Sequence, residues 1–562
     1  MSWRAIYWSA YRQSILQRSK RRHMNQKKQN ILYAAGLAIT ALVYLTAVII
    51  YHDYIMNNSD VGYLVNRGQQ ILNCLKDKNL PWFYYNDFFG LGYGSSFFYG
   101  QLTLLPFVPL LLISEEMYVY AYIAAAAALN FCGAAALFRR FGKNSRYMTL
   151  VYLLSSISID MCVVIKLYAN TMGIGLCLLF FAFCIDAFRD RKSCIPAAVC
   201  FYLLVNTHLV SAVIAAIGCI GIMLYWFDRK EWKRYLGFAG LCILVNAYYI
   251  ANVLYHMDSL NATQTINADI FNHPGMKQYV MAVVPFSEII QFVLTGNIKE
   301  TSLCCGGLML FFIYRVIKGR KTRTVKQWIL LGMCLSGIIL GIKPVWYFLA
   351  EHRMVPFFQF PVRYMPFLMV MLIVLLLSED TGKREKAVSI GYMFLYLCGY
   401  LAVLAFLTAG PCQTDTGGLE GLKKYDCYYV GNGEYVSGFC MTPDEFEWTI
   451  SHVADADGNL YEFTQKGKNQ YVDVNSSNGD VTLQIPKLYY RGYRAAIDGN
   501  EIPCEKGYSS LVMVTVPQGY NGTLTVSYEH PFWLKAMAFA CMAGTAFIYI
   551  IYFKKRQLFR TL

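Results

Sequence analysis

The chain has 562 residues, of which 56% are hydrophobic and only 15% are charged, against roughly a quarter charged in an average soluble domain. This composition excludes a disordered or fibrous chain and argues strongly against a soluble enzyme. The net charge of +15 suits a nucleic-acid-binding protein as well as a membrane protein, so the positions of the charges decide between these two classes.

Twelve apolar segments are predicted to cross a membrane as helices, although several are short for about 30 Å of hydrocarbon. About 30 polar and basic residues precede the first segment, which lacks a small-residue cleavage site, so we expect a retained helix rather than a signal peptide. The run Phe97–Ile113 contains two prolines and is expected to form a helix that lies at the membrane surface. The predicted spans are Ile31–Tyr51, Met117–Phe138, Tyr147–Ile165, Ala169–Phe188, Cys194–Asn206, Leu209–Phe227, Tyr235–Tyr255, Leu303–Ile317, Gln327–Ile342, Tyr364–Leu377, Val388–Ala409 and Phe532–Phe553.

The basic residues support this alternation of spans. Of the 50 lysines and arginines, 31 fall in seven short segments that share one side if the N-terminus is cytoplasmic. Membrane topology therefore explains the basic excess, no nucleic-acid partner is expected, and both termini are predicted to be cytoplasmic in a bacterial cytoplasmic membrane. The predicted parts are a basic N-terminus (1–30), a transmembrane domain (31–409) with a first outer loop (52–116), an extracytoplasmic domain (410–530), and a last span with a basic tail (531–562).

Short strand-like runs fill residues 471–528 and are separated by turn residues such as Asp498-Gly499, which is typical of a tight hairpin. Their even spacing predicts a β-sandwich-like domain before the last span. This domain shows no nucleophile paired with a base and no metal-ligand spacing. Its expected role is to bind a ligand or to shape the outer face, and a purely structural cap is the alternative.

Asp60 lies in the first outer loop, within about ten residues of the predicted membrane boundary, and apolar residues at helical spacing over 61–75 predict an amphipathic helix at the membrane interface. The aromatic run 82–89 is typical of the lipid headgroup region, and the glycines at 90–94 are expected to give a flexible backbone. An acid at this depth can deprotonate a hydroxyl that attacks a lipid-linked electrophile. The alternative is that Asp60 caps the helix, and the two roles are compatible.

Four cationic or titratable residues are candidates for binding an anionic lipid headgroup. Arg363 begins a span and carries a planar guanidinium that suits phosphate, and Arg353 is a weaker candidate nearby. Lys166 lies at the outer end of a span, and His208 lies in an outward turn. The alternatives are membrane anchoring by Arg363, an ordinary interfacial lysine at 166, and a hydrogen-bonded turn residue at His208.

Two further acids are secondary candidates. Asp160 lies within an apolar span, where acids are costly and often functional. The alternative is that it forms a structural ion pair with Lys166. Asp87 follows the aromatic run, with a solvated loop position as the alternative. The sequence has no glycine-rich nucleotide fingerprint and its cysteines and histidines show no metal-ligand spacing, so no cofactor is expected, although a divalent ion shared by Asp60 and Asp87 stays open.

Several segments together resemble one group of membrane proteins. Asp60 and the run LPWFYYNDFFGLGYG…FFYGQL look like the first outer loop of glycosyltransferases of the GT-C superfamily. More narrowly, the chain resembles the bacterial YfhO-like proteins and the related proteins called "6-pyruvoyl-tetrahydropterin synthase-related", although nothing in it looks like pterin chemistry. Three further segments resemble the same proteins and follow one another in the same order: FFQFPVRYMPF (357–367), VGNGEYVSG (430–438) and LYYRGYRAAIDGNEI (488–502). The resemblance covers about 31–553.

The resemblance implies a transferase that moves a sugar from a polyprenyl-phosphate donor to a cell-envelope glycopolymer or lipid acceptor, such as lipoteichoic acid, on the outer face. Asp60 matches the acidic residue that serves in GT-C enzymes as base or acceptor-orienting group, and anomeric inversion is expected. Some relatives carry a histidine shortly after this acid, where this chain has Gly62, Tyr63 and Leu64. Two other classes stay open: a transporter or flippase of lipid-linked intermediates, and a non-catalytic envelope scaffold.

Overall fold

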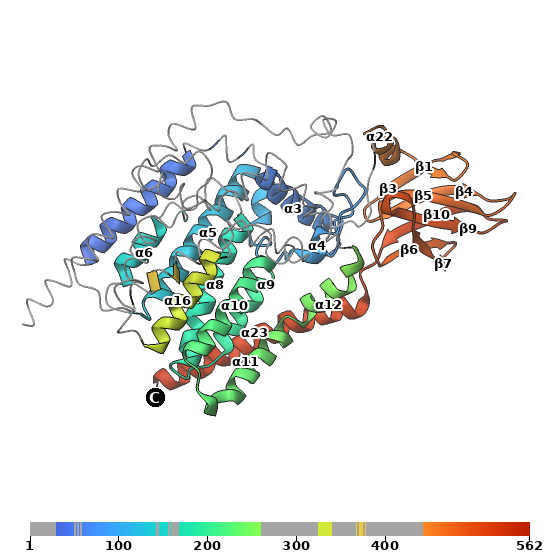
Figure 1. Cartoon of the computed structure of the whole chain (residues 1–562). Helices are drawn as coiled ribbons and strands as arrows, with labels where there is room; N and C mark the ends of the chain where they lie inside the picture. The colour runs from blue at the N-terminus through green and yellow to red at the C-terminus, as the bar shows by residue number, and fades with distance from the viewer. Residues whose placement is uncertain are drawn as a thin grey trace, which may run out of the picture.

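The computed structural model describes residues 30–49, 59–141, 145–154, 168–259, 324–339 and 443–561, together with residues 52, 56, 158, 441 and six positions between 367 and 377. Most of these residues are helical, and strands are concentrated near the C-terminus (Figure 1). The helices are Asn30–Ile49, α3 (Ser59–Lys76), α4 (Ser95–Phe98), α5 (Glu115–Phe138), α6 (Ser145–Leu153), α8 (Tyr168–Phe188), α9 (Ile195–Val205), α10 (Leu209–Tyr225), α11 (Trp232–Val245), α12 (Ala247–Tyr255), α16 (Val325–Ile339), α22 (Pro443–Ser451) and α23 (Phe532–Thr561), with single 3-10 turns η1 (Val108–Leu112), η2 (Arg229–Glu231), η3 (Met257–Ser259) and η7 (Tyr508–Ser510).

Four helices of the described residues are long and apolar enough to cross a membrane. They are Asn30–Ile49, Glu115–Phe138, Ala169–Phe188 and Phe532–Lys554. The pair α11 and α12 would make a fifth span, but it bends by 57° beside Asn246, whose side chain donates a hydrogen bond to the Cys242 carbonyl. These helices indicate a membrane protein and match four of the predicted spans.

The predicted count of twelve spans is not reached within the part of the chain that the structure describes. The segments predicted at 194–206 and 209–227 form helices α9 and α10, which are 11 and 17 residues long and shorter than the spanning helices. Most of the predicted spans at 147–165 and 364–377, and all of those at 303–317 and 388–409, lie outside the described residues. Residues 95–112 form α4, turns and η1, so the predicted surface helix is not one continuous helix.

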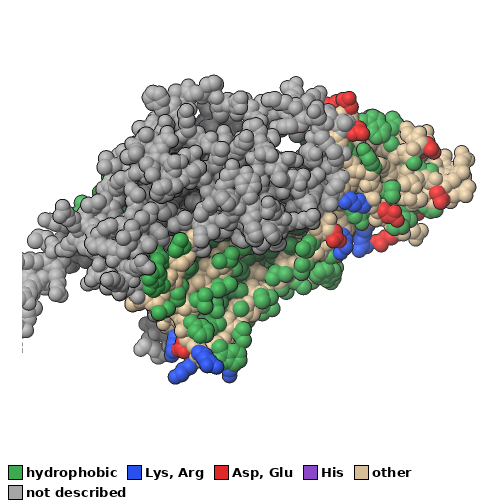
Figure 2. All heavy atoms as spheres, in the orientation of Figure 1, with side chains coloured by type: hydrophobic (Ala, Val, Ile, Leu, Met, Phe, Trp, Pro, Cys, Tyr) green, Lys and Arg blue, Asp and Glu red, His purple; other side chains and the backbone are tan. Residues whose placement is uncertain are grey.

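Helix α8 lies at the centre of the helical part and packs against α5, α9 and α10. Helices α5 and α8 approach closely because neither has a side chain at the crossing. A Cβ on Gly133 would lie 2.5 Å from the Gly175 carbonyl oxygen, and one on Gly175 would lie 2.7 Å from the Asn130 nitrogen. Apolar side chains also cover the outward faces of α11 and α12, as expected for contact with lipid (Figure 2).

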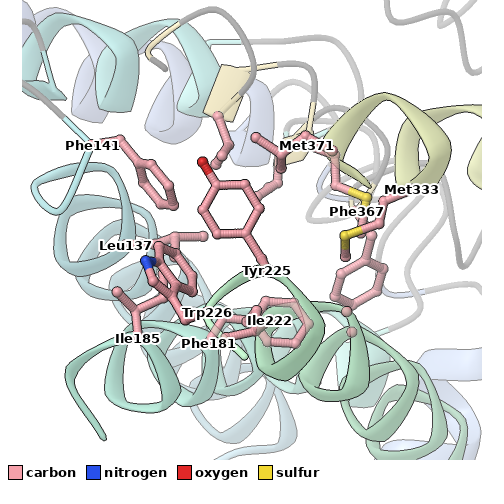
Figure 3. Close-up of a pocket in the computed structure, with 15 residues that line it drawn as sticks. Leu137, Phe141, Phe181, Ile185, Ile222, Tyr225, Trp226, Met333, Phe367 and Met371 are labelled. Atoms are coloured by element: carbon pink, nitrogen blue, oxygen red, sulfur yellow. The ribbon is translucent and has the colours of Figure 1, made fainter. Parts of the chain in front are cut away.

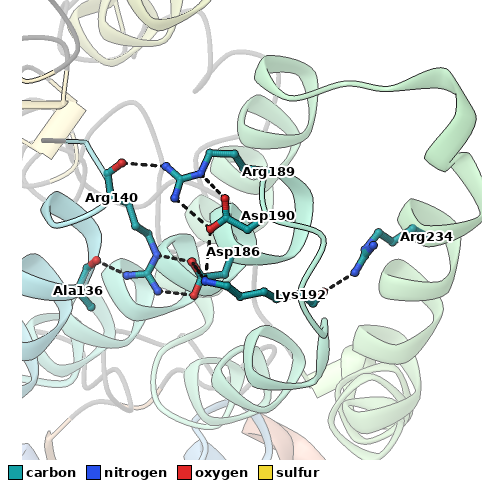
Figure 4. Close-up of polar contacts among 7 residues, drawn as sticks. All are labelled: Ala136, Arg140, Asp186, Arg189, Asp190, Lys192 and Arg234. Carbon is teal, nitrogen blue, oxygen red and sulfur yellow. Dashed lines mark hydrogen bonds and ion pairs between the residues drawn. The ribbon is translucent and has the colours of Figure 1, made fainter. Parts of the chain in front are cut away.

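Basic connections between the helices meet at one end of the helical layer. Arg140 follows α5 and forms an ion pair with Asp186 of α8, at 2.6 Å between Nη2 and Oδ2. The same carboxylate lies 3.3 Å from the Nζ of Lys192, whose carbonyl accepts a hydrogen bond from Arg234 of α11 (Figure 4). The connections after α5, after α8 and before α11 therefore share one end, as the predicted alternation of these spans requires.

The C-terminal β domain that the sequence predicts is present. Its two five-stranded antiparallel sheets have the orders β2-β1-β5-β9-β8 and β3-β4-β10-β6-β7, and their apolar faces share one core. The predicted hairpin at Asp498-Gly499 joins β6 to β7, and both residues have positive φ. The strands are β1 (Val453–Asp455), β2 (Leu460–Tyr461), β3 (Phe463–Lys466), β4 (Asn469–Asn475), β5 (Val481–Leu488), β6 (Tyr493–Ile497), β7 (Asn500–Ile502), β8 (Cys504–Lys506), β9 (Leu511–Val516) and β10 (Asn521–Tyr528).

The aromatic part of the first loop is buried against this β domain. Phe83, Tyr85 and Phe97 are at most 4% exposed and belong to the same apolar core as the two sheets. The prediction that the aromatic run lies among lipid headgroups is therefore wrong for Phe83 and Tyr85, because the β domain encloses their rings. Gly92 has a φ of +79°, and a Cβ there would lie 2.8 Å from the Phe83 ring, so this glycine sets a tight turn rather than a flexible backbone.

Hydrogen bonds hold the loop and the β domain together across about 400 residues of sequence. The Leu488 N–H donates to the Leu91 carbonyl at 2.8 Å, and the Gly94 N–H donates to the Tyr490 hydroxyl at 2.9 Å. The buried Nζ of Lys487 donates to the Tyr85 carbonyl at 3.3 Å, to the Gly90 carbonyl and to the Gln465 side chain. The first loop and the β domain thus form one packed unit.

Candidate functional site

Helix α3 carries the predicted catalytic residue near its first turn. The helix begins at Ser59, so Asp60 is its second residue rather than the cap of a helix over 61–75. The Asp60 side chain lies outside the described residues. Positions 60 and 67 are two helical turns apart, so they lie on the same face, roughly 10 Å from each other along the axis. This places Asp60 in line with Arg67.

The predicted amphipathic helix over 61–75 is confirmed, but its apolar face packs against protein. Val61, Leu64 and Ile71 are at most 5% exposed and lie in a cluster with residues of α5. At Gly68 a Cβ would lie 2.8 Å from the Tyr118 ring, so α3 and α5 approach closely there. The helix therefore packs closely against α5.

Arg67 is a buried cation that the sequence interpretation missed. Its side chain is only 3% exposed, and Nη2 donates to the Tyr99 and Gly100 carbonyls at 3.3 and 3.0 Å. Its Cζ lies 5.7 Å and 5.3 Å from the ring centroids of Tyr63 and Tyr99. Nε has no hydrogen-bond partner among the described residues. The sequence does contain a signal for it, because Arg67 falls between Leu64 and Ile71 on the apolar face.

Tyrosine side chains compensate for the burial of this charge. Burial by itself acts to lower the pKa of Arg67, but the nearby tyrosines, with Tyr84 and Tyr63 the most influential, raise it above its usual value. The guanidinium therefore stays protonated at any physiological pH. The ring faces of Tyr63 and Tyr99 add cation–π contacts. A permanent positive charge is thus fixed inside the protein beside the first loop.

Asp87 is a buried carboxyl group close to Arg67, so the alternative of a solvated loop residue is wrong. Its side chain is 5% exposed, and Oδ1 accepts hydrogen bonds from Asn66 Nδ2 at 2.7 Å and from the Phe88 N–H at 2.8 Å. Oδ2 has no partner in the described part of the chain. Burial raises the pKa of Asp87, and the hydrogen bonds and the charge of Arg67 oppose this effect. One carboxylate oxygen is therefore buried without a described hydrogen-bond partner.

His208 caps helix α10, as the hydrogen-bonded alternative predicts. It is 3% exposed, its Nδ1 lies 2.8 Å from Ser211 Oγ, and Nδ1 accepts from the Ser211 N–H at 3.2 Å. The Ser211 hydroxyl donates to Asn170 Oδ1 at 3.0 Å. The Tyr99 ring lies 6.4 Å from the His208 ring and also faces Arg67. Asp87, Arg67 and His208 therefore lie at the same end of the helical layer.

The remaining predicted site residues cannot be compared with this arrangement. Asp160, Lys166, Arg353 and Arg363 all lie outside the described residues. Their roles as acid and as phosphate ligands stay predictions, as does a metal ion shared by Asp60 and Asp87. Within the described ranges no group of three or more His, Cys, Asp and Glu side chains could hold a metal ion.

A second cluster of buried titratable groups joins α12, β10 and α23. His256 and His530 are 0% and 4% exposed, and each places a ring nitrogen 3.3 Å from the Tyr528 hydroxyl. Their rings stack on Phe97 and Trp82, with centroids 3.6 and 5.1 Å apart. This cluster joins the β domain to the helices and the first loop, so its role is structural.

We expect this histidine cluster to lose stability in acid. Burial, with neighbouring positive groups, lowers the pKa of His256 to about 3 and of His530 to about 4. In the unfolded chain the two histidines take up protons below the ordinary histidine pKa of about 6.5, whereas in the folded chain they stay neutral until about pH 3–4. The free energy of unfolding therefore decreases as the pH is lowered through this window. The melting temperature of the detergent-solubilised protein should drop between pH 7 and pH 4.5.

The control for this effect is a pair of variants. Replacing both buried histidines, as His256→Gln with His530→Gln, should flatten the dependence of the melting temperature on pH. Replacing the partly exposed His452 by glutamine should leave it unchanged. An unaltered pH dependence in the double variant would show that other groups cause it.

An apolar cavity lies at the opposite end of the helices, near the basic connections. Phe181, Trp226 and Met333 contribute to its lining, which comes from α5, α8, α10, α16 and residues near 370 (Figure 3). Apart from the Tyr225 hydroxyl and the Trp226 indole nitrogen, the described lining is apolar, and it contains no carboxylate, histidine, lysine or arginine that could bind a phosphate or act as a general base.

The described candidate site therefore consists of Arg67 and Asp87, with His208 beyond Tyr99 and with Asp60 on the face of α3 that carries Arg67. No protein-family model, curated protein or solved structure matches this chain. The resemblance to YfhO-like proteins accordingly stays a prediction.

Proposed function

We propose that this protein is a membrane glycosyltransferase of the GT-C type, with twelve spans and both termini cytoplasmic. It transfers a sugar from a polyprenyl-phosphate donor to a cell-envelope acceptor on the outer face. The spanning helices, the gathering of basic connections at one end and the β domain near the other end support this proposal.

One observation carries the proposal. A hydrogen-bond donor, Nε of Arg67, and an acceptor, Oδ2 of Asp87, are both buried in one cluster without a described partner. Leaving such groups unpaired costs about 1–3 kcal/mol each, and more when they are charged. A glycosyl phosphate carries anionic oxygens that match the arginine and hydroxyls that match the carboxylate.

The proposed reaction uses Asp60 as the general base. Its carboxylate takes the proton of an acceptor hydroxyl, whose oxygen attacks the anomeric carbon of the donor sugar. The bond between that carbon and the phosphate oxygen breaks, and the polyprenyl phosphate leaves with the bonding electrons. Cationic groups stabilise the leaving phosphate, and we assign this task to Arg67 together with Arg363, Lys166, His208 and Arg353.

The candidate site is closed to water in this structure, because Arg67 and Asp87 are at most 5% exposed. Donor binding therefore requires part of the first loop to move away from Arg67. Tyr99 and Gly100, whose carbonyls accept from Nη2, are the residues that this movement would release.

We expect Arg67→Lys to reduce sugar transfer about 100-fold, because lysine keeps the charge but has neither Nε nor the planar fork. The measurement is sugar incorporation into envelope polymers in a deletion strain that is complemented with each variant. Protein amount and melting temperature are determined in parallel.

The matched control is Arg191→Lys, because this arginine is 62% exposed and lies at the opposite end of the helices. It should restore transfer fully. Full restoration by Arg67→Lys as well would remove Arg67 from the site. If deletion of the gene changed no envelope sugar but altered the movement of lipid-linked intermediates, the transporter alternative would replace the enzyme.

A further inference from the structure

The β domain carries an open groove at one edge of its two sheets. It lies where the chain passes from β2, the edge strand of one sheet, to β3, the edge strand of the other. The groove holds about 420 Å³, within the roughly 300–1,000 Å³ of small-ligand clefts. It is separate from the Arg67 cluster.

The lining places aromatic rings beside hydrogen-bonding groups. Tyr461 and Tyr471 are half-buried and line the groove, and the Tyr461 hydroxyl donates to Asp455 at 2.9 Å. Thr464 pairs with Tyr471 across strands β3 and β4. Asp473 lies two residues after Tyr471 and therefore on the same face of the sheet.

Two carboxylates give the groove a negative character. Glu462 and Asp473 both line it, and among the described residues neither forms an ion pair with a lysine or arginine. These charges repel an anionic polymer. A neutral ligand with hydroxyl donors, in contrast, finds acceptors in both carboxylates.

We infer that this groove is a binding site for a neutral carbohydrate. A sugar ring has an apolar face of C–H groups that packs on a tyrosine ring, and hydroxyls at its edge that bond to carboxylate and threonine oxygens. The lining offers both, in adjacent positions. The proposal does not depend on the transfer reaction, because it concerns binding alone.

An extended peptide fits this place less well. Peptides that add a strand to a sheet need a long free edge, whereas β2 has two residues and β3 has four. The Gln465 side chain of β3 moreover donates to Asn86 of the first loop at 2.5 Å, so part of this edge is already in contact with the rest of the chain.

The test uses the full-length protein in lipid nanodiscs. Chitotetraose and maltotetraose serve as neutral probes, poly(glycerol phosphate) as the anionic probe and a short extended peptide as the fourth, with binding followed by saturation-transfer NMR and calorimetry. At least one neutral oligosaccharide should bind, and Tyr471→Ala should weaken it at least about tenfold, which corresponds to about 1.4 kcal/mol.

The matched control is Tyr508→Ala, because this tyrosine of the same domain is 65% exposed and does not line the groove. It should leave binding unchanged. Asp473→Asn should weaken binding of the neutral oligosaccharide. It should not raise the affinity for poly(glycerol phosphate) to that of the neutral oligosaccharide. Absence of binding by both neutral probes, binding of only the polymer or the peptide, or an equal loss in Tyr508→Ala would overturn the assignment.

Discussion

Gly100→Ala is expected to destabilise the protein by about 3 kcal/mol or more, at the upper end of what overpacking usually costs. A Cβ at this position would lie 2.1 Å from the carbonyl oxygen of Asn206. Since this neighbour is backbone at the end of α9, it cannot turn aside as a side chain would. The clash would also disturb the Gly100 carbonyl, which accepts from Arg67. Thermal unfolding of the solubilised protein measures the effect.

Gly240→Ala is the matched control for this substitution. Gly240 lies within α11, and nothing approaches an added Cβ within 4 Å. Alanine in an unobstructed helix stabilises by up to about 1 kcal/mol relative to glycine, so this variant should melt at the same temperature as the wild type or higher. If both variants were equally stable, the close approach between Gly100 and α9 would be wrong.

Asp60→Asn is expected to reduce sugar transfer by about 10²–10⁴-fold, the usual contribution of a general base. Asparagine keeps the size and the polarity of the side chain but cannot accept the proton of the acceptor hydroxyl. Because Asp60 lies in the first turn of α3, the substitution also removes a negative charge from a helix N-terminus, which costs only about 0.3–1 kcal/mol. Folding should therefore survive, and incorporation of sugar into envelope polymers is the measurement.

Glu115→Gln separates catalysis from this helix effect. Glu115 is an exposed acid in the first turn of α5, so its substitution removes the same kind of charge from a different helix. It should leave transfer unchanged. Normal glycosylation by Asp60→Asn, where deletion of the protein abolishes it, would contradict the catalytic assignment. Labelling of a cysteine at position 60 from the cytoplasmic side alone would contradict the proposed topology.

Local patterns predicted several elements well. The spacing of apolar residues gave the helix at 61–75, and the turn residues Asp498-Gly499 gave a hairpin with positive φ at both positions. Four long apolar runs became helices of spanning length. Each of these features depends on residues that are close in sequence, which is why periodicity and turn chemistry are enough to find them.

The candidate site was harder to predict, because it depends on burial. Arg67 falls on the apolar face of an amphipathic helix, which indicates burial, but only the fold shows that α5 and the segment at Tyr99 enclose it. Asp87 looks like a loop residue until Asn66 and the Phe88 N–H hold one of its oxygens. The enclosing groups come from separate elements, and no local pattern indicates which of them will meet.

The sequence by itself determined that this is a largely helical membrane chain with a β domain before its last span, because composition, hydropathy and strand alternation are properties of the chain alone. Only the tertiary structure decided that the first loop packs into that β domain, through contacts such as Gly94 with Tyr490, and that Arg67 is buried. The physical reason is that hydrophobic burial does not specify its partner. The aromatic residues at 82–98 could have been buried by lipid or by protein, and the fold places most of them against the sheets, nearly 400 residues away in the sequence.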